Sequence, residues 1–165
     1  VYKRQVQMTL TTYDEELCRK IEPHVSTTRE RFEVLMRCKE LGIPTLVWMT
    51  PILPFINDTR ENIEGLLDYC LLAGVQGILV FDVGVTLREG DREYFYQALD
   101  RDFPGIRQKY ISTYGNAYDI PSPYAKELMA LIQNTCVANG MLCSPKECFT
   151  YLHEFPERYV QQTLF

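Results

Sequence analysis

Polar side chains gather at the ends of three apolar segments of this sequence. They are Thr9, Thr11 and Thr12 after the first segment, Thr50 and the turn at residues 51–54 after the second, and Asp82, Thr86 and Arg88 after the third. Taken singly, each is as easily a turn or cap residue. If the segments are parallel strands, however, their carboxyl ends share one edge of a sheet, where α/β proteins bind ligands. The pattern therefore predicts a ligand-binding rim.

Other chemistries find less support in the sequence. The two histidines, His24 and His153, lie far apart, so a Ser/His/Asp or Cys/His assignment would be arbitrary. Gly74, Gly77 and Gly84 do not have the G-x-G-x-x-G spacing of a phosphate-binding loop. No catalytic residue can be named from these patterns.

The six cysteines predict buried thiols rather than a metal centre. None forms a C-x-x-C pair, and three fall on the apolar faces of predicted helices. Cys143 and Cys148 lack the further ligands that a zinc or iron–sulfur site needs. We therefore expect no metal ligands in this chain, and free thiols in a reducing, cytoplasmic environment.

Length and charge limit the function classes. The 165 residues predict one domain with its own core. There is no signal-peptide pattern and no apolar run of the ~20 residues that span a bilayer, so we expect no membrane partner. The net charge of −5 does not favour nucleic-acid binding. One basic cluster is a local exception, for which a solvated face is the simpler explanation. It comprises Arg88, Arg92, Arg101, Arg107 and Lys109.

The predicted rim requires parallel strands, and apolar spacing predicts three of them. Residues 6–12 alternate between apolar and polar side chains, so one face of this strand is polar. Residues 43–49 and 75–83 are mostly apolar runs. Strands separated by single helices are expected to be parallel, with right-handed crossovers.

The helices between these strands are predicted to begin at capping boxes, at residues 27–30 and 58–61, and to end at Gly42 and Gly74. Either Asp58 or Thr59 can cap the second helix. Residues 13–25 are expected to form a polar connection before the first of them. That first helix should bury one stripe of side chains, namely Phe32, Leu35, Cys38 and Leu41.

The pattern after residue 91 is mainly helical. Helices are predicted at residues 92–99 and 106–114, followed by a loop at 115–123. A helix capped by Ser122 should run to about residue 139, then a short extended piece at 141–143. A last helix starts at Ser144 and is expected to carry Phe155 and to end at Pro156.

Residues 1–5, VYKRQ, are expected to be a sequencing-adapter scar. Their codons can be written GTG-TAT-AAG-AGA-CAG, which matches the transposon end used to fragment DNA for sequencing. We expect the native gene to extend upstream of them. A three-stranded parallel sheet would also leave edges unpaired, which supports further strands upstream.

These segments resemble the later half of radical S-adenosylmethionine (SAM) enzymes related to spore photoproduct lyase. The likeness covers most of residues 6–155. It is carried by VQMTLTT, by GIPTLVWMTPILPFINDTRENIEGLLDYCLLAGV, and by VGVTLREGDREYFYQALDRDFPGIRQKYISTYGNAY. The last run is similar to a bacterial subgroup described as radical SAM proteins or DNA repair photolyases.

The resemblance implies an α/β fold, the carboxyl-terminal half of a partial (β/α)6 TIM-like barrel. Residues 6–90 would supply three parallel strands with crossover helices, and residues 91–165 a helical carboxyl-terminal extension of the same domain. The family binds a 4Fe–4S cluster through C-x3-C-x2-C after its first strand. This chain has no such motif, so the cluster ligands are expected upstream and the fragment alone should be inactive.

In this family the reduced cluster cleaves SAM to a 5′-deoxyadenosyl radical, which abstracts a hydrogen from the substrate. The resemblance implies SAM-binding roles for seven residues. These are Thr9 and Thr11 for the ribose or carboxylate, Thr50 and Pro51 for the adenine or methionine portion, Val83 and Gly84 for backbone contact with the adenine, and Arg88 for the cofactor carboxylate or a substrate phosphate. It also implies an electron donor such as flavodoxin or ferredoxin, and it suggests a nucleic-acid substrate in DNA repair.

Two other hypotheses remain open. The chain could belong to another (β/α)-barrel enzyme, such as an aldolase or a phosphate-binding type, although no predicted strand ends in a catalytic lysine. It could instead be a non-catalytic binding module whose basic, tyrosine-rich region at residues 88–114 holds a protein or nucleic acid.

Overall fold

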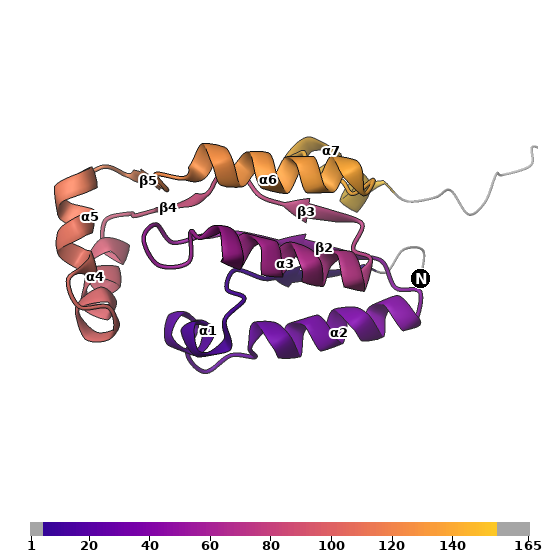
Figure 1. Cartoon of the computed structure of the whole chain (residues 1–165), viewed down its shortest axis with the longest axis horizontal. Helices are drawn as coiled ribbons and strands as arrows, with labels where there is room; N and C mark the ends of the chain where they lie inside the picture. Colours follow the sequence, from indigo (N-terminus) through magenta and orange to yellow (C-terminus); the bar gives the residue numbers. More distant parts are fainter. Residues whose placement is uncertain (1–4, 155–165) are drawn as a thin grey trace, which may run out of the picture.

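Three short parallel strands form the centre of the fold, in the order β1-β2-β3 (Figure 1). The structure is a computed structural model that describes residues 5–154. The strands are β1 (Val6–Thr9), β2 (Thr45–Trp48) and β3 (Gly77–Leu79). The first three helices are α1 (Glu15–Ile21), α2 (Thr28–Glu40) and α3 (Arg60–Ala73). The remaining elements are β4 (Gly84–Thr86), α4 (Asp91–Asp102), α5 (Ile106–Tyr114), β5 (Asp119–Pro121), α6 (Ala125–Ala138) and α7 (Pro145–His153).

The strand pairing confirms a mixed α/β fold with a parallel sheet. β1 pairs with β2 in the register Val6↔Thr45, and β2 pairs with β3 in the register Leu46↔Gly77. α2 and α3 are the crossover helices that the sequence predicts. In Figure 1, α4 and α5 lie together at the left.

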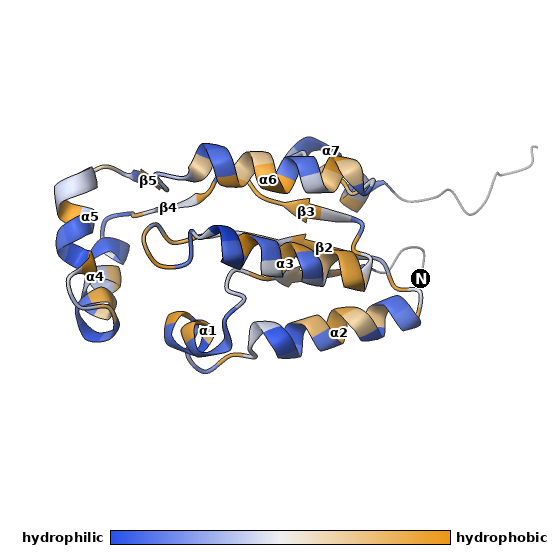
Figure 2. Ribbon diagram, viewed as in Figure 1, coloured by the Kyte–Doolittle hydropathy of each residue, from blue (hydrophilic) through white to orange (hydrophobic). Residues whose placement is uncertain are grey.

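One face of the sheet is covered by α2, α3 and α6, which form the main hydrophobic core with it. Leu10, Val47 and Ile78 are fully buried in this core. α2 begins at the predicted capping box, in which the Glu30 carboxylate accepts the Thr27 N–H at 2.7 Å. Blue and orange residues alternate along α2 and α3 in Figure 2, as expected of helices with one buried face.

The opposite face of the sheet is covered only in part. α7 packs against Leu46 and Leu79 on this face. Nearer the carboxyl ends, the rings of Trp48 and Phe81 lie 6.2 Å apart, and Phe81 is 56% exposed. The polar side chains of β1 are exposed, which confirms the predicted alternation. Within residues 5–154, β1 has no strand partner on its outer edge. The outer edge of β3, by contrast, forms an isolated β-bridge between Gly77 and Leu142.

The prediction of a connection without a helix at residues 13–25 is wrong, because α1 lies within it. Asp14 caps α1 by accepting the Leu17 N–H at 2.7 Å. The sequence of this helix shows almost no apolar periodicity, and only Cys18 is buried. The N-cap residue Asp14 is the one local signal that a helix begins here.

The predictions for residues 75–83 and 115–123 also need correction. β3 ends at Leu79, and β4 and β5 form a separate antiparallel pair where a loop was expected. A Cβ atom at Gly84 would lie 2.5 Å from the Ile120 carbonyl oxygen, so glycine permits this close pairing. The pair joins segments far apart in the chain, which local patterns do not reveal.

The second predicted capping box, at residues 58–61, does not form. Of the two predicted cap residues, Thr59 caps α3, by accepting the Asn62 N–H at 3.2 Å. Leu41 is also misassigned to the buried stripe of α2, because it stands at the C-cap and is 58% exposed.

The carboxyl-terminal helices follow the predictions closely. α5 matches the predicted residues 106–114, and α7 begins at the predicted cap, Ser144. The N-cap residue of α6 is Tyr124 and not Ser122, although the Ser122 hydroxyl accepts the Tyr124 N–H at 3.0 Å and donates to Asp58. α7 ends at His153, and the end predicted at residues 155–156 lies outside the described residues.

The cysteines are free thiols, as predicted, and five of the six are buried. Among residues 5–154, no group of three or more His, Cys, Asp or Glu side chains is placed to hold a metal ion. The same residues contain no helix that is long and apolar enough to cross a membrane.

Two buried asparagine side chains connect the segment after β1 to the turn after β2 by hydrogen bonds. Asn57 donates to the Thr11 carbonyl oxygen and the Thr12 hydroxyl, both at 3.0 Å. Asn62 donates to the same Thr11 oxygen at 2.9 Å and accepts the Tyr13 N–H at 2.6 Å. Buried polar groups without partners cost free energy, so these amides hold the end of β1 against the start of α3.

Replacing Asn62 by alanine should lower the free energy of unfolding by about 1–3 kcal/mol, because buried backbone groups lose their partners. Urea unfolding followed by circular dichroism measures this change. Asn134→Ala, on the exposed side of α6, is the control and should stay within about 0.5 kcal/mol of the parent protein. Equal stability of the two variants would contradict the role of Asn62.

Candidate functional site

The carboxyl ends of the strands open onto two cavities that share Pro51 and Val85. The first, here called the strand-end trough, has a volume of about 620 Å³ and lies beyond β2 and β3. It is lined by Thr50, Pro51, Phe81, Asp82, Gly84, Val85, Thr86, Asp119, Ile120 and Pro121. The second, here called the α1–α4 groove, has a volume of about 380 Å³ and lies between the end of α1, the turn after β2, and α4.

The strand-end trough is acidic and rich in oxygen acceptors. Asp82 and Asp119 line it together with Thr50 and Thr86, and its lining includes no basic side chain. One Asp82 carboxylate oxygen accepts the Val83 N–H at 2.7 Å, which orients this carboxylate. Carboxylates and hydroxyls suit a ligand that carries positive charge and hydroxyl groups.

The α1–α4 groove is mainly apolar. Its walls include the buried side chains of Leu53 and Leu99 and the half-buried ring of Phe95. Its charged side chains include Arg101 and Asp102, which form an ion pair at 2.7 Å. The two cavities therefore differ in chemistry, one suited to a polar cation and the other to an apolar group.

Five of the seven predicted site residues line these cavities, namely Thr9, Thr11, Thr50, Pro51 and Gly84. Val83 is in neither lining, and its side chain is fully buried in the main core. Its N–H bonds to Asp82, and its carbonyl oxygen accepts the Ser122 N–H at 2.8 Å. Arg88 is in neither lining, and its guanidinium donates to the Tyr118 hydroxyl at 3.4 Å. These two residues are not brought together with the other five.

Thr11 has a structural role that the sequence did not indicate. Its hydroxyl donates to the Glu22 carboxylate at 2.8 Å. Glu22 also pairs with Arg31 at 2.5 Å, and Arg31 donates to the Thr9 carbonyl oxygen at 3.0 Å. Sequence reasoning missed Glu22 and Arg31 because the unpredicted helix α1 brings Glu22 to this place. Asp119 was missed for a similar reason, since β5 was predicted as a loop.

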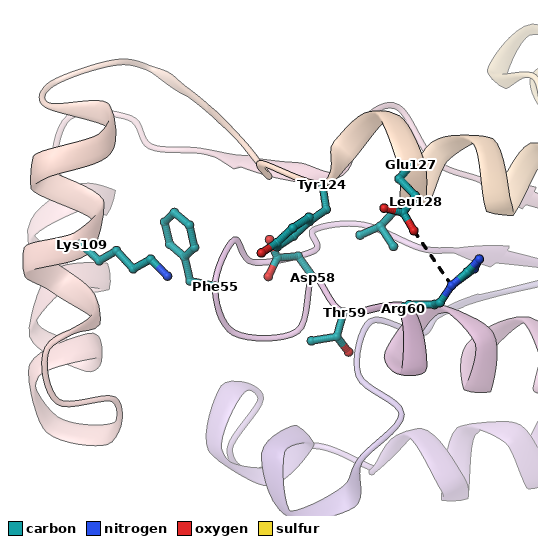
Figure 3. Close-up of a pocket in the computed structure, with 8 residues that line it drawn as sticks. All are labelled: Phe55, Asp58, Thr59, Arg60, Lys109, Tyr124, Glu127 and Leu128. Carbon is teal, nitrogen blue, oxygen red and sulfur yellow. Dashed lines mark ion pairs between the residues drawn. The ribbon is translucent and has the colours of Figure 1, made fainter.

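A third cavity lies on the other side of the turn after β2 (Figure 3). Its volume is about 440 Å³, and it is lined by Phe55, Asp58, Thr59, Arg60, Lys109, Tyr124, Glu127 and Leu128. Figure 3 shows Lys109 pointing toward Phe55, and its Nζ lies 4.0 Å from the ring centroid. Asp58 is buried and accepts the Ser122 hydroxyl at 2.5 Å. These contacts tie the turn after β2 to the segments on either side of it.

Burial raises the pKa of the Asp58 carboxyl, although the hydrogen bond from Ser122 opposes this shift. Tyr110 is fully buried nearby and donates its hydroxyl to the Pro54 carbonyl oxygen at 2.8 Å. Burial, with a smaller effect of the Asp58 charge, also raises the pKa of Tyr110. The Tyr110 hydroxyl therefore remains a hydrogen-bond donor to the turn.

Most of the predicted basic cluster has partners within the protein. Arg92 donates to backbone carbonyl oxygens, including that of Ala117 at 2.6 Å. Arg107 pairs with Asp100 at 2.5 Å, and Arg101 pairs with Asp102. These contacts favour a structural role for the arginines over an open nucleic-acid-binding face.

Comparisons with known proteins give no named function. No family model matches the chain, and no solved structure matches it significantly. Similar proteins include the uncharacterized proteins Rv2578c and MT2655 of Mycobacterium tuberculosis and Mb2609c of Mycobacterium bovis. Each is 29% identical over 123 residues, which are 74% of this chain and 36% of the relative. The chain thus matches little more than a third of the length of these relatives.

Thr11→Val should lower the free energy of unfolding by about 1 kcal/mol, because the Glu22 carboxylate loses a hydrogen bond. Thr9→Val should change it by less than about 0.5 kcal/mol, because the Thr9 side chain is exposed. Thermal or urea unfolding distinguishes the two. Indistinguishable stabilities would show that the Thr11–Glu22 contact does not stabilise the rim.

Asp58→Asn should change how stability depends on pH. Burial raises the pKa of Asp58 in the folded protein above 3.8. The parent carboxyl therefore contributes most to the free energy of unfolding below pH 3.8, and its contribution is lost as the pH rises through the raised pKa. The variant lacks this titration, so its stability relative to the parent should increase with pH over that range. Asp68→Asn, on the exposed side of α3, is the control for loss of one charge. A constant difference between parent and Asp58→Asn across the range would contradict the assignment.

Proposed function

We propose that the chain is the carboxyl-terminal part of a radical SAM enzyme related to spore photoproduct lyase. Its strands β1, β2 and β3 would be the fourth to sixth strands of a partial (β/α)6 barrel. Two features support this. The three parallel strands are adjacent in sequence order, and α2, α3 and α6 cover one face of them as the outer helices of a barrel would.

The other face of the sheet has the character expected of a barrel interior, which further strands would enclose. The exposed polar side of β1 resembles the lining of a barrel interior more than a solid core. The relatives that match this chain are also considerably longer than the matched segment. In the whole protein, strands before β1 would pair with its outer edge and close the barrel interior.

The acidic trough at the strand ends is the observation that carries the proposal. SAM combines a sulfonium cation and an ammonium group with ribose hydroxyls, and Asp82 and Asp119 suit both kinds of group. The exposed ring of Phe81 offers a flat surface for the adenine. Thr50 and Thr86 would hold ribose or amino-acid oxygens, and Pro51 and Val85 would separate SAM from the α1–α4 groove.

When bound and reductively cleaved, SAM supplies the 5′-deoxyadenosyl radical that abstracts hydrogen from a substrate. Residues 5–154 do not include ligands for the 4Fe–4S cluster, so these would come from another part of the whole protein. Flavodoxin or ferredoxin would provide the electron. This chain's own task would be to bind and orient SAM and to keep water away from the reacting centre.

Fluorescence of Trp48 tests the proposal directly. It is the chain's one tryptophan, and its ring lies 6.2 Å from Phe81 in the trough. Titration with SAM should give a saturable change in emission. Asp82→Asn should weaken binding about tenfold or more, because a charge-assisted contact of about 1.5–3 kcal/mol is lost. S-adenosylhomocysteine, which lacks the sulfonium charge, should also bind more weakly than SAM.

Asp68→Asn removes a carboxylate of α3 far from the trough lining and should leave SAM binding unchanged. A parent protein whose fluorescence does not saturate with SAM, and whose calorimetric titration shows no heat of binding, would contradict the proposal. Equal effects of the two Asp→Asn variants would show that the trough is not the binding site.

A further inference from the structure

Four of the six cysteines gather near the amino end of β3, away from the strand-end rim. Cys70 of α3 and Cys136 of α6 are fully buried in the main core, and Cys143 packs against that core. Cys148 of α7 lies on the other side of β3, with its Sγ 3.8 Å from the Ile78 carbonyl oxygen. Of these four, Cys136 and Cys143 are the two whose thiols share a hydrogen bond.

Cys136 and Cys143 are brought together by a reversal of the chain after α6. Gly140 adopts a left-handed conformation with φ of 66°, and the Met141 N–H then bonds to the Cys136 carbonyl oxygen at 2.9 Å. Leu142 bonds to the edge of β3, which fixes the direction of the returning chain. Cys143 follows directly and packs against the core that contains Cys136.

Cys143 is the most accessible thiol of the group. It is the one cysteine of the six that is not buried. A hydrogen bond from Cys136 holds the pKa of Cys143 below its usual value, because it stabilises the thiolate. Burial raises the pKa of Cys70 to about 12 and that of Cys148 to about 11, so both remain thiols near neutral pH.

We propose that Cys143 and Cys136 form an oxidisable dithiol that hydrogen peroxide converts to a disulfide. The Cys143 thiolate attacks one peroxide oxygen and breaks the O–O bond, which gives a sulfenic acid and releases hydroxide. The Cys136 sulfur then attacks the Cys143 sulfur and loses its proton, and the sulfenic hydroxyl leaves as water. The two thiols together lose two electrons, and the peroxide is reduced to water.

The disulfide would have a local structural effect. It would tie the end of α6 covalently to the segment that extends the edge of β3 through Leu142. This part of the fold lies at the amino end of the sheet, so oxidation would leave the strand-end trough in place. The proposal therefore does not depend on the proposed SAM chemistry.

Peptide mass spectrometry after peroxide treatment tests the proposal on the native chain. Free thiols are first blocked with iodoacetamide, and the digest is run with and without dithiothreitol. The parent protein should lose two of its six free thiols and yield a Cys136–Cys143 disulfide peptide that dithiothreitol removes. Cys143→Ser should keep its remaining thiols under the same treatment.

In Cys136→Ser and Cys136→Ala, Cys143 should stop at a sulfenic acid that dimedone traps. Cys136 is fully buried, so two substitutions are used, and the one that folds serves as the test. Cys38→Ser, in α2, is the matched control and should still form the disulfide. Oxidation of buried cysteines before Cys143, a disulfide to Cys148, or six free thiols after treatment would overturn the proposal.

Discussion

The amide side chains of Asn57 and Asn62 are the interaction on which the rest of the rim depends. They bind backbone groups of the segment that leaves β1, and they also fix the turn that leaves β2. Parallel strands do not connect their own carboxyl ends, so these ends need other partners. Asp58 and Tyr110 extend the same arrangement outward, through Ser122 and the Pro54 carbonyl oxygen. These bonds hold the turn that lies between the two cavities of the rim.

The turn after β2 separates three environments of different chemistry. Pro51 stands between an acidic trough and an apolar groove, and the opposite side of the turn faces the cavity around Asp58. An acidic, oxygen-rich site beside an apolar one is well suited to hold a charged cofactor next to a less polar substrate. Near α4 and α5, Arg101 and Arg107 form ion pairs with Asp102 and Asp100, so their charges are offset within the fold.

Local sequence patterns predicted the elements whose signals are local. The alternation in β1, the capping box at Thr27 and the helix stop at Gly74 depend on neighbouring residues, and the structure confirms them. The pairing of β4 with β5 depends on the approach of Gly84 to Ile120, which no local pattern encodes. The sequence predicted where the rim lies, but it did not predict the hydrogen-bond partners of the rim residues. Thr11 illustrates this, since its hydroxyl bonds to Glu22 through a helix that the sequence hardly indicates.

The most direct test of the central claim uses the full-length product of the gene that encodes this chain. The protein is reconstituted anaerobically with iron and sulfide, then given dithionite and SAM, and 5′-deoxyadenosine is measured by chromatography. If the protein is a radical SAM enzyme, 5′-deoxyadenosine should form when cluster, reductant and SAM are all present, and Asp82→Asn should lower its yield. A reconstituted protein that binds no cluster, or that forms no 5′-deoxyadenosine, would contradict the proposed activity.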